Sequence, residues 1–103
     1  MPEGLTGKQR RHLRALGHHL TPVVQIGHEG VSEALVQQTD GQLEAHELIK
    51  IKIGENAPED RHASAEALAE KTRSQVAQVL GRTALLYRPR QENPAIELPG
   101  AKE

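Results

Sequence analysis

The sequence contains no cysteine, and Tyr87 is its only aromatic residue. Without cysteine the chain has neither a disulfide nor thiolate chemistry, which is compatible with a reducing compartment. No apolar run approaches the roughly 20 residues that a membrane-spanning helix needs. The first residues also lack the basic and apolar pattern of a secretion signal. We therefore expect a cytoplasmic protein that does not bind membranes.

The hydrophobic fraction is low, at 36% of 103 residues, so the core must be built from leucine, isoleucine, valine and alanine. That supply is enough for a small sheet with helices packed on it. A chain of this length is typical of one domain. We assign the domain to residues 1–98 and a flexible tail to residues 99–103.

The formal net charge of −1 conceals an uneven distribution of charge. Residues 1–26 carry Lys8, Arg10, Arg11 and Arg14 against Glu3 alone, which is a net charge of +3. The residues from 91 to 103 carry a net charge of −2. A basic front and an acidic tail predict a local basic face, which is what contact with phosphate requires.

Hydrophobic periodicity and turn residues predict the order of the secondary structure. Helices are expected within residues 6–20, 32–46 and 60–80, and strands at residues 23–26, 47–53, 83–87 and 95–98. In the first helix Thr6 and Gln9 fit a capping box, and the leucines at 13, 16 and 20 share one face. Gly81 is expected to end the third helix.

The alternation of strands and helices predicts how the strands pair. Strand–helix–strand units imply parallel pairing with right-handed crossovers. Lys50 and Lys52 alternate with the isoleucines at 49, 51 and 53, so one face of the sheet should be less apolar than the other. We expect one compact α/β domain with a four-stranded mixed sheet and three helices.

The segment Gly27-His28-Glu29-Gly30 follows a short apolar strand and precedes a helix that Ser32 can cap. A Gly-x-x-Gly loop that clamps a nucleotide backbone is one known means of binding RNA, and a helix N-terminus suits a phosphate. His28 can donate a hydrogen bond to a phosphate oxygen, whereas Glu29 must point away from it. The alternative interpretation is an ordinary turn between a strand and a helix.

Several basic side chains are candidates for phosphate contact, although a solvated helix face would also explain those near the start of the chain. The candidate RNA-binding residues are Lys8, Arg10, Arg11, Arg14, His18, Gly27, His28, Gly30, Lys50 and Lys52. Arg82, Arg88 and Arg90 either extend this basic surface or are solvated loop charges.

Catalytic and metal sites find little support in the sequence. His12 and His19 share a helical side but are separated by about 10 Å along the axis, which is too far for one zinc ion. No nucleophile elbow and no complete phosphate-binding loop of an NTPase is present. We therefore expect no enzymatic activity, no cofactor and no metal.

The scarcity of aromatic residues also restricts the kind of RNA that this chain could bind. Modules that read single-stranded bases on a sheet stack them on aromatic side chains, and this chain has Tyr87 alone. We therefore expect contacts with the backbone of structured RNA, and we expect no binding to DNA.

Four segments together resemble a known family. They are Leu5-Thr6-Gly7-Lys8-Gln9-Arg10, His18-His19-Leu20-Thr21-Pro22-Val23-Val24, His46-Glu47-Leu48-Ile49-Lys50-Ile51-Lys52-Ile53 and Leu85-Leu86-Tyr87-Arg88-Pro89. In this order, over about residues 4–98, they resemble the bacterial single-domain YhbY proteins of the CRM-domain RNA-binding family. Glu29 inside the loop is a departure from the family pattern.

The resemblance implies a fold similar to the C-terminal domain of translation initiation factor three. It also implies RNA binding through the glycine loop, here Gly27 and Gly30, and through a basic surface that begins at Lys8 and Arg10. Because bacterial members are associated with precursors of the large ribosomal subunit (pre-50S), we expect a monomer that binds rRNA during ribosome biogenesis. The alternative is an adaptor that contacts ribosomal or RNA-processing proteins without touching RNA.

Overall fold

Three helices and four strands make up the part of the chain that the computed structural model describes, residues 4–100. In chain order these elements are α1 (Gly7–Gly17), β1 (Pro22–Ile26), α2 (Glu33–His46), β2 (Leu48–Ile53), α3 (Arg61–Thr72), β3 (Gln75–Leu80) and β4 (Thr83–Tyr87). The last three residues of the expected C-terminal tail lie outside the described part. Within residues 4–100, the Gln9 side-chain amide donates a hydrogen bond to the carbonyl oxygen of Pro99 at 3.2 Å.

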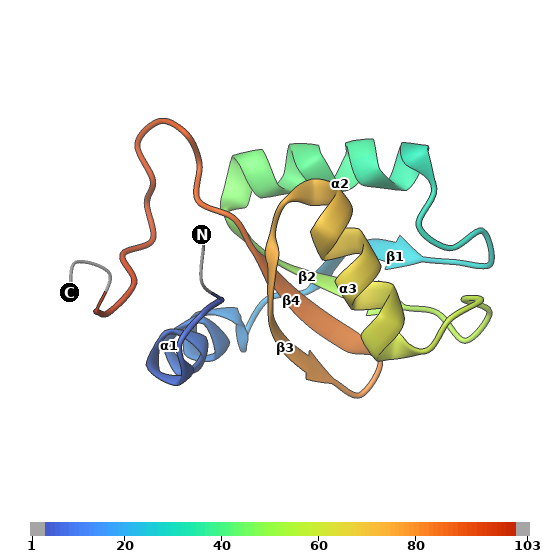
Figure 1. Cartoon of the computed structure of the whole chain (residues 1–103), viewed down its shortest axis with the longest axis horizontal. Helices are drawn as coiled ribbons and strands as arrows, with labels where there is room; N and C mark the ends of the chain where they lie inside the picture. The colour runs from blue at the N-terminus through green and yellow to red at the C-terminus, as the bar shows by residue number, and fades with distance from the viewer. Residues whose placement is uncertain (1–3, 101–103) are drawn as a thin grey trace.

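The four strands form one mixed sheet in the order β1-β2-β4-β3 (Figure 1). Strands β1 and β2 run parallel because α2 returns the chain to the same end of the sheet. The other two pairs, β2–β4 and β3–β4, are antiparallel. The expected α/β domain with a mixed sheet and three helices is therefore confirmed.

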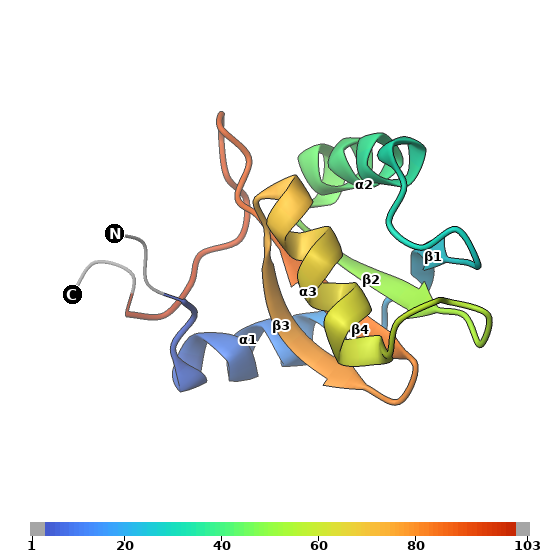
Figure 2. The ribbon, with the colours of Figure 1, turned by 45° about the vertical axis from the view of Figure 1, so that its right-hand side comes forward.

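Each face of the sheet has its own hydrophobic cluster. Helices α2 and α3 cover one face, where Ile49, Ile51 and Ile53 are buried, and α1 packs on the other face through Leu13 (Figure 2). The alternation in β2 explains this division because successive side chains point to opposite faces. Lys52 is exposed on the α1 face, which is the less apolar one as expected.

The predicted third helix over residues 60–80 is wrong in its second half. Helix α3 ends at Thr72, Arg73 adopts a left-handed conformation, and residues 75–80 form β3. The register between β3 and β4 shifts between Val76 and Gln78, so Val76 and Val79 both pack on the cluster under α2 and α3. A bulge thus produced a three-residue spacing that imitates a helix.

The prediction for Gly81 is wrong for the same reason. Gly81 does not end a helix, because it lies in the turn between β3 and β4 with φ +59°. A two-residue hairpin turn favours glycine at a position with positive φ. The pairing of β3 with β4 therefore overrides the local helical pattern.

The expected strand at residues 95–98 is absent from the described part of the chain. The backbone N–H groups of Ala95 and Ile96 instead donate to the buried side chain of Glu47, each at 2.9 Å. Ile96 and Leu98 pack against the cluster under α1. The segment is held by one carboxylate and by apolar contacts, and β1 and β3 remain the edges of the sheet.

Candidate nucleic-acid interface

The Gly-x-x-Gly loop between β1 and α2 forms a tight turn. The backbone N–H of Gly30 donates to the carbonyl oxygen of Gly27 at 2.9 Å, and Ser32 then caps α2. Gly30 has φ +70°, and a Cβ there would lie 3.1 Å from Cγ of Pro58. The position therefore requires glycine. A Cβ at Gly27 would meet nothing within 4 Å, so the backbone at Gly27 is open to an incoming group.

Three connections meet beside this loop at the carboxyl ends of β1 and β2 (Figure 1). Gly54 donates its backbone N–H to Ile26 at 2.9 Å, and a Cβ at Gly54 would lie 3.1 Å from the same carbonyl oxygen. Arg82 joins the third connection, because its carbonyl accepts from Ile53 at 2.8 Å and its guanidinium donates to Gly54 O at 3.0 Å. We call residues 27–30, 54–58 and 81–82 the loop edge.

A hollow of about 620 Å³ lies on one side of the glycine loop and is called the basic hollow. Its lining residues are Gln25, Gly27, His28, Lys52, Ile53, Gly54, Glu55, Asn56 and Arg82. Two cations, Lys52 and Arg82, thus face one carboxylate, Glu55. The balance of charge in this hollow favours a phosphate.

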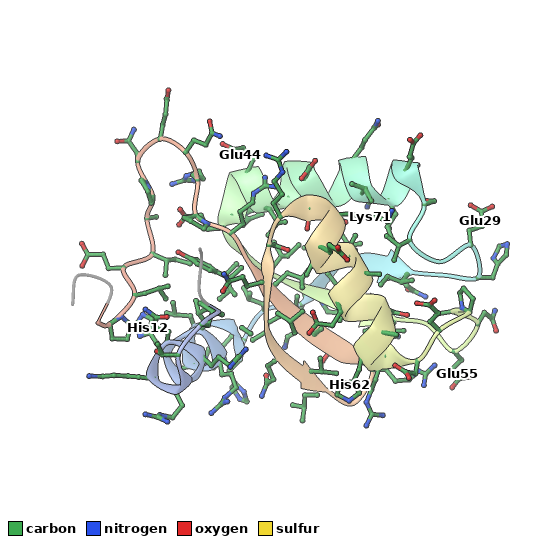
Figure 3. The ribbon with its side chains drawn as sticks, viewed as in Figure 1. His12, Glu29, Glu44, Glu55, His62 and Lys71 are labelled. Carbon is green, nitrogen blue, oxygen red and sulfur yellow. The ribbon has the colours of Figure 1, made fainter. Side chains whose placement is uncertain are left out.

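The other side of the same loop differs in charge. A hollow of about 280 Å³ there is lined by Glu29, Ser32 and Gln38 together with His28 and loop glycines, and it contains no lysine or arginine. Figure 3 shows Glu29 and Glu55 on separate loops of the loop edge. A phosphate that approaches the loop is therefore better stabilised beside Lys52 and Arg82 than beside Glu29.

Helix α1 presents the second group of candidate residues. Its capping box is confirmed: the Gln9 N–H donates to the Thr6 hydroxyl at 3.0 Å, and the Thr6 N–H donates to the Gln9 side chain at 3.1 Å. The predicted contact residues that are exposed on this helix and just after it are Lys8, Arg10, Arg11, Arg14 and His18. Within residues 4–100 none of them forms an ion pair, so their charges are available to a ligand.

The inner side of α1 differs in part from the expected leucine face. Leu13 is fully buried, but Leu16 and Leu20 keep 45% and 36% of their surface exposed. Gly17 is buried in their place, and a Cβ there would lie 2.7 Å from Cδ2 of Leu85. The absence of a side chain at Gly17 therefore allows α1 to approach β4 closely and positions the basic side chains over the sheet.

The structure brings some of the predicted residues together and leaves others apart. Gly27, His28 and Lys52 meet at the basic hollow, and Gly30 shapes the loop. Lys50 lies on the same strand face as Lys52, one repeat nearer the start of β2. The basic side chains of α1 belong to a separate area, because β1 spans five residues, or roughly 16 Å, between the two.

The remaining arginines have different surroundings. Arg88 forms an ion pair with Asp40 at 2.7 Å and donates to the carbonyl of Thr72, also at 2.7 Å, so it holds α2 and α3 to the end of β4. Arg90 donates to the carbonyls of Ala45 and Asn93. These two side chains are structural, whereas Arg82 is exposed at the basic hollow.

The sequence left open whether Arg82 extends the basic surface or is a solvated loop charge, and it gave no indication that Gly54 belongs to the site. Arg82 follows the glycine that was expected to end a helix, and only the β3–β4 hairpin brings it beside Gly54. The pattern Leu80-Gly81-Arg82-Thr83 before a strand was the available signal for that turn.

The described residues also bear on the questions of a metal-ligand cluster and a membrane-spanning helix. No group of three histidine or acidic residues between positions 4 and 100 could hold a metal ion. None of the helices in that range is long and apolar enough to cross a bilayer.

The sequence matches the model of the CRS1/YhbY (CRM) domain over residues 5–88. The chain belongs to the CRM-domain family. The match confirms the resemblance that the four sequence segments indicated. It covers the glycine loop, α1 and the whole sheet of this CRM domain.

Similar proteins cover nearly the whole length of the chain. The probable RNA-binding protein YqeI of Bacillus subtilis is 48% identical over 95 residues, which are 92% of this chain and 99% of YqeI. An RNA-binding protein of Haemophilus influenzae is 36% identical over 92% of this chain and 95% of its own length. The solution structure of the hypothetical protein SAV1595 from Staphylococcus aureus matches with a TM-score of 0.79 and 46% identity, covering 92% of this chain and 99% of that one.

Proposed function

We propose that this CRM-domain protein binds RNA without enzymatic chemistry and acts in ribosome assembly, where it holds rRNA of a large-subunit precursor. The observation that carries the proposal is the glycine loop beside the basic hollow, in a chain whose relatives are named as RNA-binding proteins. The setting we propose is the cytoplasm, with the protein acting as a monomer. DNA and membranes are not among the proposed partners.

The basic hollow offers three kinds of donor to one phosphate. His28 lines the hollow and its backbone N–H donates no hydrogen bond to another described residue, so an RNA oxygen can accept from it. Lys52 and Arg82 supply charge, and hydrogen bonds between charged partners are about twice as strong as neutral ones. Open backbone at Gly27 lets the sugar–phosphate chain come close.

The second contact is with α1, whose cations would neutralise further phosphates. The length of β1 separates the basic hollow from α1. An RNA that contacts both areas must therefore present phosphates at two separate points. Two separated phosphate contacts favour RNA with a defined shape over a short flexible strand.

The lack of aromatic side chains at this surface supports backbone contact. No aromatic residue lines the basic hollow, and Tyr87 is only 6% exposed within the cluster under α1. Base stacking on phenylalanine, tyrosine or tryptophan, which single-strand binders use, has no platform here. We therefore propose structured rRNA as the ligand.

The test combines sedimentation with direct binding. Cell lysates would be fractionated on sucrose gradients at low and moderate salt, and RNA affinity would be measured with the precursor rRNA and with DNA of the same sequence. We expect co-migration with a large-subunit precursor and at least tenfold weaker RNA binding in Lys52→Glu/Arg82→Glu. The control is Lys71→Glu, which reverses the charge of one exposed lysine in the last turn of α3 (Figure 3).

Two results would contradict the proposal. If the protein stayed at the top of the gradient at both salt concentrations, stable association with a ribosomal precursor would be excluded. If the protein showed no affinity for naked RNA, or an affinity that did not fall as the salt concentration rose, the adaptor alternative would replace RNA binding.

A further inference from the structure

A third hollow, called the apolar hollow, lies at the amino ends of β1 and β2. It has a volume of about 340 Å³ and is lined in part by Leu16, Leu20, Val23, Leu48 and Lys50. These residues come from α1, from the connection after α1 and from the two parallel strands. The hollow therefore exists only because α1 packs across the start of the parallel pair.

The apolar side chains at this hollow are exposed together. Four large hydrophobic side chains among the described residues are exposed, and three of them line the hollow: Leu16 at 45%, Leu20 at 36% and Val23 at 39%. Scattered exposed aliphatic side chains are ordinary, but a contiguous apolar patch on a monomer marks an interaction site. The clustering therefore makes this hollow a candidate docking surface.

The position of the apolar hollow separates it from the proposed RNA contacts. The basic hollow lies at the carboxyl ends of β1 and β2, whereas the apolar hollow lies at their amino ends. Leu16 follows Arg14 by two residues, so its side chain is turned about 200° around the α1 axis from the arginine. Both surfaces can therefore be occupied at the same time.

Charge at the hollow restricts the chemistry of the occupant. Lys50 is half-buried and forms no ion pair or hydrogen bond with another described residue, and His46 also lines the hollow. No aspartate or glutamate is among the lining residues. Covering Lys50 would remove water from its ammonium group, which is costly unless the occupant supplies a carboxylate or another anion.

The aliphatic character of the surface favours a protein over RNA as the source of that anion. RNA exposes a polar sugar–phosphate backbone, and its apolar parts are base faces, which stack best on aromatic or arginine side chains. The residues that line the hollow include no arginine, and His46 is their only aromatic ring. A leucine, isoleucine or valine side chain matches Leu16, Leu20 and Val23 by burying aliphatic surface.

We propose that the apolar hollow binds a protein partner. The partner would contribute a short segment with an aliphatic side chain against Leu16, Leu20 and Val23 and a carboxylate beside Lys50. A second copy of this chain fits less well, because the Lys50 ammonium at the hollow would repel its own copy across a symmetric interface. The protein would then connect RNA at one end of its parallel strands to a protein at the other.

The test is photo-crosslinking in cells from within the hollow. The photoreactive amino acid p-benzoylphenylalanine would replace Leu16 in the full chain, and the adducts and their crosslinked segments would be identified by mass spectrometry. The expected adduct is one protein whose crosslinked segment carries aliphatic and acidic side chains. The same amino acid at exposed Ala15, on the other flank of α1, is the matched control and should not give that adduct.

The role of Lys50 is tested in the same background. Lys50→Glu should reduce the yield of the adduct at least tenfold, and Lys50→Arg should retain it, because only the arginine keeps the positive charge. A synthetic peptide of the crosslinked segment should bind the purified protein, and its Asp→Asn or Glu→Gln form should bind at least tenfold more weakly.

Four outcomes would overturn the proposal. Adducts only with RNA would assign the hollow to the nucleic acid, and adducts only with this chain would indicate self-association or an intramolecular contact. No adduct above that from Ala15, or an adduct that is unaffected by Lys50→Glu, would exclude a partner of the proposed chemistry. Circular dichroism of each variant would establish that the fold is retained.

Discussion

The carboxylate of Glu47 accepts a hydrogen bond from the backbone N–H of Ile96 at 2.9 Å, which ties the C-terminal segment to the start of β2. The same carboxylate accepts from the N–H groups of Arg90 at 2.8 Å and Ala95 at 2.9 Å. Glu47 is 1% exposed and has φ +67°, a conformation that costs a non-glycine residue about 1–3 kcal/mol. The three donors offset this cost by satisfying a buried charge.

Replacing Glu47 with glutamine should destabilise the protein by about 1–3 kcal/mol at pH 7. The side-chain NH₂ group of glutamine is a donor, and it would face a backbone N–H donor in place of an acceptor oxygen. Urea denaturation would measure the free energy of unfolding. Glu92→Gln, on an exposed residue in the same segment, is the matched control and should change it by less than about 0.5 kcal/mol. An equal effect of the two variants would contradict the role of Glu47.

The stabilisation by Glu47 should also depend on pH. Burial alone would raise the pKa of Glu47, but the backbone donors and the charge of Arg90 hold that pKa below its usual value of 4.5. A carboxylate with a lowered pKa stabilises the folded state above the unfolded-state pKa and ceases to do so as the pH falls through the folded-state pKa. The difference in unfolding free energy between the original chain and Glu47→Gln should therefore be constant at neutral pH and shrink below about pH 4.5.

Gly17 and Gly41 should respond oppositely to alanine, although both lie in helices. A methyl group at Gly17 would meet the buried Leu85 at 2.7 Å, so Gly17→Ala should cost about 1–3 kcal/mol. A methyl group at Gly41 would meet nothing within 4 Å, so Gly41→Ala should stabilise α2 by up to about 1 kcal/mol. Thermal or urea unfolding would compare the two variants, and a stabilising Gly17→Ala would show that α1 packs less closely than described.

The two glycines of the loop should separate stability from binding. Gly30→Ala should destabilise the protein by about 1 kcal/mol or more, because φ is positive and Pro58 lies close. Gly27→Asp should leave the unfolding free energy nearly unchanged and weaken RNA binding at least tenfold, since it adds a carboxylate to the basic hollow. Gly27→Ala adds only a methyl group at the open backbone and should weaken RNA binding less than Gly27→Asp does; equal losses in both variants would point to a steric effect instead.

The basic face of α1 should contribute to RNA affinity through counterion release. Replacing Arg10 and Arg14 with glutamine should weaken RNA binding and reduce the slope of log K against log salt by about 0.7–0.9 for each phosphate that the helix no longer neutralises. Both side chains are exposed and unpaired within the described residues, so the thermal midpoint should hardly change. Lys71→Gln is the control, and an unaltered salt slope in the double variant would exclude α1 from the interface.

Reversal of charge on the same helix is the stronger form of this experiment. Replacing Arg10, Arg11 and Arg14 with glutamate should abolish RNA binding while the circular dichroism spectrum is retained. Persistent binding in that triple variant would assign the affinity to the loop edge alone.

Local patterns determined much of this fold. Thr6 and Gln9 specify the start of α1 within four residues, and the isoleucines of β2 specify a strand with two unlike faces. The glycine loop and the family could be predicted for the same reason, since each is recognised from residues that are neighbours along the chain. These signals need no knowledge of which segments meet in space.

The tertiary structure alone decided the features that depend on distant residues. Val76 and Val79 match a helix or a bulged strand, and only pairing with β4 selects the strand. The local sequence gives no sign that Glu47 is buried, because its hydrogen-bond donors come from the C-terminal segment. Arg82 joins the basic hollow through a hairpin, and Gly17 matters because Leu85 lies beneath it. Each depends on contacts between residues far apart in the sequence, whose free energy exceeds the weak local preferences.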